Sequence, residues 1–111
     1  MVSVYEFPTL LRIIHFFAGE GIMAEIKVEK LSDEELKSLG VDDWSPWECE
    51  PSTFDWEYDE KETCYVLEGK VKVKTPDGEV EFGKGDLVTF PKGLKCTWNV
   101  IEKIRKTYKF G

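Results

Sequence analysis

The chain has 111 residues, a length that suits one domain and is too short for two independent hydrophobic cores. Hydrophobic residues make up 41% and charged residues 33%, which indicates a globular protein with a filled interior and a charged surface. Asp and Glu outnumber Lys and Arg by 22 to 15, and the formal net charge of -7 repels phosphate backbones and anionic lipid surfaces. We therefore expect neither nucleic acid nor a membrane as a partner.

The first feature along the chain is the apolar run 10–17, the most hydrophobic stretch of the sequence. It is too short to span a bilayer, and because no basic segment precedes it we expect no signal peptide. Two interpretations remain open. Residues 1–22 form either an extra strand or helix that covers a barrel edge or a dimer partner, or an upstream extension of a compact domain that comprises residues 23–111 and begins at Met23.

A strand and a short helix are expected next. Apolar and charged residues alternate over residues 24–29 with the period of a half-buried strand. Ser32 and Glu35 then have the spacing of a helix capping box, and Gly40 stands where a left-handed C-terminal cap belongs. These signals predict a helix over residues 33–39.

The rest of the chain shows only strand signals. The turn residues 76–78 separate two alternating runs, 71–74 and 79–82, which predicts a hairpin. The strands expected after the helix comprise residues 44–47, 54–58, 62–67, 70–75, 79–82, 87–90, 95–101 and 104–110. About eight short strands separated by Gly or Pro turns are typical of an all-β sandwich or barrel.

Two segments resemble the sequence motifs of the cupin superfamily. In the first, Glu62 precedes Gly69 by seven positions. In the second, five residues separate Gly85 from the Pro-x-Gly segment 91–93, and Cys96 follows at the position of a metal ligand. The pattern is similar to that of the small single-domain cupins grouped with ureidoglycine aminohydrolase and the ethanolamine-utilisation cupins. The resemblance implies an all-β, single-domain jelly-roll barrel with one short N-terminal helix.

The resemblance also implies where a metal would lie. Metal-binding cupins place a His-x-His pair before the Glu and a third His after the Pro-x-Gly segment. The corresponding positions here are Trp56, Tyr58, Glu62 and Cys96, and the single histidine, His15, lies outside both motifs. We therefore expect no metal cofactor. If a divalent metal is bound, Glu62 and Cys96 are the expected ligands.

Strand parity together with the resemblance predicts the wall of the barrel cavity. Alternate residues of a strand share one face, and the resemblance turns that face inward. The predicted cavity residues are Trp56, Tyr58, Glu62, Cys64, Cys96 and Trp98. An inward carboxylate is costly to keep without a partner, so we predict that Glu62 is the general base or ligand-binding group, assisted by Tyr58 or Cys96. The two tryptophans and two thiols can equally be core filling.

The chain has three cysteines, and their number and spacing indicate the cellular compartment in which the protein works. Cys49, Cys64 and Cys96 have no C-x-x-C spacing, which fits neither a disulfide framework nor a zinc knuckle, so we expect a reducing, cytoplasmic setting. Thiols buried beside a carboxylate should be less ionised than free ones. The charged stretches 59–61 and 103–106 are interpreted as a solvated turn and a protected strand edge.

Three functions remain open at this point. The protein is an enzyme acting on a small polar metabolite, a non-catalytic module that binds a small molecule in the same cavity, or a structural protein whose cavity is filled by side chains. On each view we expect a homodimer, because cupins commonly pair through their sheets and the apolar run near the N-terminus needs cover.

Overall fold

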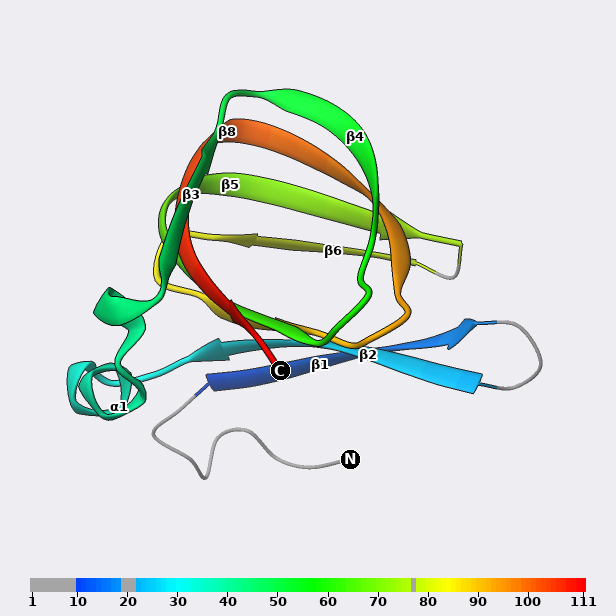
Figure 1. Cartoon of the computed structure of the whole chain (residues 1–111). Helices are drawn as coiled ribbons and strands as arrows, with labels where there is room; N and C mark the ends of the chain where they lie inside the picture. Colours follow the sequence, from blue (N-terminus) through cyan, green and yellow to red (C-terminus); the bar gives the residue numbers. More distant parts are fainter. Residues whose placement is uncertain (1–9, 19–21, 77) are drawn as a thin grey trace.

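The computed structural model describes residues 10–18, 22–76 and 78–111, with side chains from residue 26 onward. Within these ranges the elements follow one another in the order β1 Leu10–Ala18, β2 Ile22–Lys30, α1 Asp33–Leu39, η2 Val41–Asp43, β3 Ser45–Cys49, β4 Ser52–Glu57, β5 Glu62–Thr75, β6 Gly78–Gly83, β7 Leu87–Phe90 and β8 Lys95–Phe110 (Figure 1). The all-β class with one short α-helix is confirmed.

Two long strands organise the fold, because the two halves of β5 and of β8 pair with different strands. The first half of β5 pairs with β7 and with the second half of β8, and through them with β2, β1 and β3. The second half of β5 pairs with β6 and with the first half of β8, which in turn pairs with β4. Figure 1 shows β3, β4, β5 and β8 curving around one interior above the β1–β2 hairpin. The described strands thus form one bent sheet in a jelly-roll arrangement.

The sequence suggested breaks in β5 and β8 where the structure has bends. The residues expected as four separate strands form two continuous ones, and the pairing of β5 with β8 shifts register at three places between Val66 and Val71. Gly69 lies at this bend with φ of 100°, and a Cβ atom there would collide with the backbone of Lys103 and Ile104. Gly69 therefore permits a close approach of two strands, whereas Gly85 lies in a turn between β6 and β7.

Helix α1 begins and ends as its sequence predicts. The Ser32 side chain accepts a hydrogen bond from the backbone N–H of Glu35, and the Glu35 side chain accepts one from the backbone N–H of Ser32. Gly40 closes the helix in the left-handed conformation. No helix in the described part of the chain is long and apolar enough to cross a membrane.

The apolar run near the N-terminus lies in strand β1, which pairs with β2 along its whole length. In the next strand, Ile26 and Val28 are buried, as their alternation predicts. The division of the chain after residue 22 stays a prediction.

An aromatic cluster fills much of the interior enclosed by the bent sheet. The Trp98 ring is central to it, with ring centroids of Trp47, Phe54, Phe82 and Phe90 at 6.0, 5.9, 5.7 and 5.8 Å. Such edge and stacked contacts add to the free energy of burial and hold each ring in one orientation. One side of this cluster forms the wall of the candidate site.

Candidate functional site

A cavity of about 300 Å³ opens at one end of the molecule between β3, β4, the start of β5 and β8. It is lined by Trp47, Phe54, Trp56, Tyr58, Glu62, Trp98, Lys106, Tyr108 and Phe110. Seven of these nine side chains are aromatic, and the other two carry opposite charges. The volume lies at the lower end of the range for small-molecule sites, so the cavity suits a compact, mainly apolar molecule.

The two charged groups of the cavity form a buried ion pair. Nζ of Lys106 donates a hydrogen bond of 2.6 Å to Oε2 of Glu62, and each side chain is 6% exposed. The pairing of strands positions both residues. Glu62 opens β5 between Phe90 of β7 and Phe110 of β8, whereas Lys106 lies on β8 opposite Trp47 of β3. Removing two charges from water is costly, and the short contact offsets part of that cost.

Three aromatic rings also surround the Lys106 ammonium. Nζ lies 5.0 Å from the ring centroid of Trp47, 4.7 Å from that of Trp98 and 5.6 Å from that of Tyr108. These distances are in the range of cation–π attraction, which is strongest for desolvated cations. The rings and the carboxylate together hold the ammonium at one place in the cavity.

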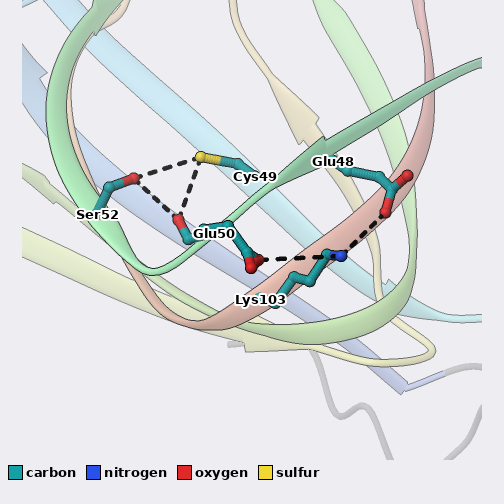
Figure 2. A network of polar contacts seen from close by, with 5 residues as sticks. All are labelled: Glu48, Cys49, Glu50, Ser52 and Lys103. Atoms are coloured by element: carbon teal, nitrogen blue, oxygen red, sulfur yellow. Dashed lines mark hydrogen bonds and ion pairs between the residues drawn. The ribbon is translucent and has the colours of Figure 1, made fainter.

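The interpretation of residues 103–106 as a solvated edge is therefore wrong for Lys106. Lys103 is solvated as predicted, with Nζ 3.5 Å from a carboxylate oxygen of Glu48 and 3.9 Å from one of Glu50 (Figure 2). The stretch is not a strand edge, however, because β8 pairs with β5 on one side and with β3 and β4 on the other. The difference follows from strand parity, since Ile104, Lys106 and Tyr108 alternate on the inward face of β8. The sequence contains a signal for this, because Lys106 alternates with the apolar Ile104 and with Tyr108 along the strand and should therefore face inward with them.

Tyr58 occupies a fully buried place beside the ion pair. Its ring stacks on Phe90 with centroids 4.7 Å apart, and its hydroxyl oxygen accepts a 3.0 Å hydrogen bond from Nε1 of Trp98. Burial, followed by the nearby Glu62 and the two thiols, raises the pKa of this phenol well above its ordinary value. The raised pKa favours the protonated phenol, a neutral group that can both donate and accept a hydrogen bond.

The structure brings four of the six predicted cavity residues together and leaves two outside the wall. Trp56, Tyr58, Glu62 and Trp98 line the cavity, and Trp56 is the most exposed of them at 48%. Cys64 is fully buried in the core, while Cys96, the partner of Trp56 across β4 and β8, lines an open depression beside Asp55 and Lys74. The aromatic residues of β3, β4 and β8 that complete the wall were not predicted.

The buried thiols have the protonation expected of them. Desolvation is the main cause that raises the pKa of Cys64 to about 12, although Lys106 opposes it, and the pKa of Cys96 is raised by desolvation, Asp55 and Glu62 to about 11. Both are therefore neutral thiols at physiological pH. The third cysteine, Cys49, is the last residue of β3, and its Sγ is 3.3 Å from Oγ of Ser52 and from the carbonyl oxygen of Glu50 (Figure 2).

The residues present do not fit a metal ion. At the positions where metal-binding cupins have histidines, this chain has Trp56, Tyr58 and Cys96, and the carboxylate of Glu62 is already paired with an ammonium group. Within the described residues, no three His, Cys, Asp or Glu side chains lie close enough together to hold a metal. A divalent cation at Glu62 would have to displace the charge of Lys106 and would find no imidazole among the side chains that the structure describes.

Comparison with known proteins identifies the family to which the chain belongs. The family model of the EutQ-like cupin domain matches residues 36–108. A DUF861 family protein from Thermotoga maritima, whose crystal structure is known, is 56% identical to this chain; the alignment covers 78% of this chain and 99% of that protein, with a TM-score of 0.76. No curated protein matches the chain.

More distant structures share the fold alone. The EutQ protein of Clostridium difficile is 20% identical over 91% of this chain and 61% of its own, with a TM-score of 0.51. A putative ethanolamine utilization protein Q from Salmonella typhimurium is 17% identical over 88% of this chain and 92% of its own, with a TM-score of 0.52. At such identities the likeness concerns the course of the backbone and not the lining of the cavity.

Proposed function

The chain belongs to the EutQ-like cupin family, and we propose that its aromatic cavity binds a small molecule. Glu62 and Lys106 would provide the polar contacts to this molecule. The ion pair is the observation that carries the proposal. Apolar side chains of similar volume fill a core at least as favourably as a buried ion pair, so a purely structural cavity gains little from one. A pair that faces a cavity is instead available to a ligand.

The chemistry of the wall limits the kind of molecule that we propose. Flat aromatic faces favour a planar or apolar body, and the opposite charges of Glu62 and Lys106 leave no net charge for an ionic ligand to neutralise. Lys106 has donors for an acceptor of the ligand, and Glu62 has acceptors for a donor. An uncharged molecule with both kinds of group, such as an amide, matches this arrangement.

The proposal is tested by the fluorescence of the cavity tryptophans. Trp47, Trp56 and Trp98 line the wall, so a bound molecule changes their emission. A panel of small uncharged amides and alcohols, with benzamide and benzyl alcohol as first members, is titrated into the natural chain, Glu62→Gln and a control, Glu68→Gln. Glu68 forms an exposed ion pair with Arg105 and lies outside the cavity wall.

We expect binders that Glu62→Gln weakens and Glu68→Gln does not. A panel in which no molecule changes the emission, or in which the two variants behave alike, contradicts the proposal. In that case the third function, a structural cupin with a filled cavity, accounts better for the protein.

We propose a homodimer as the form of the protein, with strand β1 as the contact. Among the described strands β1 pairs only with β2, so one edge of an apolar segment offers backbone groups to a second copy. The molar mass measured by light scattering tests this, with removal of residues 1–18 expected to give monomers. The three cysteines, all free thiols, support a cytoplasmic location as a further part of the proposal.

A further inference from the structure

The charged groups of the cavity present a hydrogen-bond acceptor and a donor side by side. Among the described residues, the hydrogen bond from Lys106 is the only one to the Glu62 carboxylate, and it ends on Oε2. Oε1 therefore remains as an acceptor, and the Lys106 ammonium, with three N–H groups, remains as a donor. We infer that the cavity binds a planar cyclic amide, whose ring N–H donates to Glu62 and whose C=O accepts from Lys106. This chemical class rests on the proposed binding of a small molecule and narrows it.

The geometry of the amide group selects a ring. The nitrogen and oxygen atoms of an amide lie about 2.2 Å apart, which is close to the 2.6 Å between Nζ of Lys106 and Oε2 of Glu62. In an open-chain secondary amide the C–N bond is almost always trans, so N–H and C=O point in opposite directions and only one of them can reach the pair. Ring closure holds both groups on one edge of the molecule. Peptides and other open-chain secondary amides therefore match the pair poorly.

Two aromatic side chains of the wall supply faces for a flat ring. Trp56 and Phe110 line the cavity, and about half of each side chain is exposed. A ligand that covers such a side chain removes apolar surface from water, and stacking favours a planar partner. Phe110 is also the strand partner of Glu62 across β5 and β8, so a ring that contacts Phe110 lies near the carboxylate.

Tyr58 provides a further donor in the cavity wall. Its hydroxyl oxygen accepts a hydrogen bond from Nε1 of Trp98, and no group in the described part of the chain accepts the hydroxyl proton. A carbonyl oxygen has two lone pairs, so the C=O of a cyclic amide can accept from both Lys106 and Tyr58.

The test compares three small molecules by isothermal titration calorimetry on the full chain. Isocarbostyril is a cyclic amide fused to a benzene ring. N-Methylbenzamide carries the same amide in an open chain, and isocoumarin has a ring oxygen in place of the N–H of isocarbostyril. We expect isocarbostyril to bind about 10-fold more tightly than either of the others, which is the usual contribution of a hydrogen bond to a charged group.

Two variants show whether Glu62 reads the ring N–H. In Glu62→Gln the side-chain oxygen can stay on Lys106, and the group that faces the ligand is then a donor. The preference for isocarbostyril over isocoumarin should therefore disappear in this variant. Glu68→Gln changes an exposed carboxylate outside the cavity wall and should keep the full preference. A preference that survives in Glu62→Gln would contradict the assignment.

The comparison in the natural chain decides alone if a variant folds poorly. If the three molecules bind equally, or if only benzamide or benzyl alcohol binds, the cyclic amide is refuted and the binding function stands. If none of these molecules binds, both are refuted.

Discussion

Nζ of Lys106 and Oε2 of Glu62 lie 2.6 Å apart in a cavity whose other lining residues are all aromatic. The contact joins the first residue of β5 to the second half of β8. The pair is the feature on which the proposed ligand binding rests. It also makes the fold sensitive to substitution, because each buried charge is compensated by the other.

Removing one partner of the ion pair should destabilise the protein more than removing both. Lys106→Met leaves the Glu62 carboxylate buried without a cation. We expect the free energy of unfolding, measured by urea denaturation, to fall by about 3–5 kcal/mol. The double variant Glu62→Leu/Lys106→Met replaces both charges by apolar groups and should recover most of this loss. Equal destabilisation of the single and double variants would show that packing, not charge, sets the effect.

Gly69→Ala should be more destabilising than Gly93→Ala. Both glycines have positive φ, 100° and 87°, so each substitution carries the left-handed penalty of about 1–2 kcal/mol. A Cβ at Gly93 meets nothing within 4 Å, whereas one at Gly69 collides with the backbone of Lys103 and Ile104. Urea denaturation should show an extra loss of about 1–3 kcal/mol for Gly69→Ala, and equal losses would contradict the close approach.

Stability should fall in alkaline solution because of Cys64. Its pKa rises from 9.0 to about 12 on folding, so above pH 9 the unfolded chain loses a proton that the folded chain keeps. The contribution is fully present below pH 9 and is lost as the pH rises towards 12, at about 1.4 kcal/mol per pH unit. Melting temperatures of the natural chain and of Cys64→Ala, measured from pH 7 to 11, should show a shallower decline for the variant. Parallel declines would exclude this thiol as the cause.

Tyr58→Phe should weaken the aromatic wall without removing its ring. The substitution keeps the stacking on Phe90 but leaves the buried Nε1 of Trp98 without its acceptor, a loss of about 1–3 kcal/mol in unfolding free energy. In a Trp98→Phe background the same change should have little effect. A double-mutant cycle measures this difference, and a coupling near zero would mean that the hydrogen bond contributes nothing.

Much of the fold follows from local sequence signals. The capping box of Ser32 and Glu35 predicts α1 residue for residue, and the alternation after Ala24 predicts the buried face of β2. The bends of β5 and β8 were missed because Gly69 reads equally well as a turn or as a bulge. Only the approach of Lys103 and Ile104, more than thirty residues away, selects the bulge.

The site was harder to predict than the fold. Glu62 and Tyr58 were found from their place in the motif, but Lys106 was assigned to the surface because it ends a run of charged residues. Its parity with Ile104 and Tyr108 indicates an inward position, but the partner that compensates its buried charge, Glu62, comes from another strand and cannot be identified from this segment. The same holds for Trp47 and Phe54, whose inward position depends on how β3 and β4 pair with β8.

Strand β8 carries Trp98 and Lys106 on either side of its irregular segment, where Trp98 pairs with Phe54 of β4 and Lys106 with Trp47 of β3. The width of the cavity thus depends on the curvature of a single strand. Inserting or deleting one residue in that segment would reverse the inward and outward faces of the strand beyond it and would turn either Trp98 or Lys106 away from the cavity. The cavity therefore tolerates a change in the curvature of β8 but not a change in its number of residues.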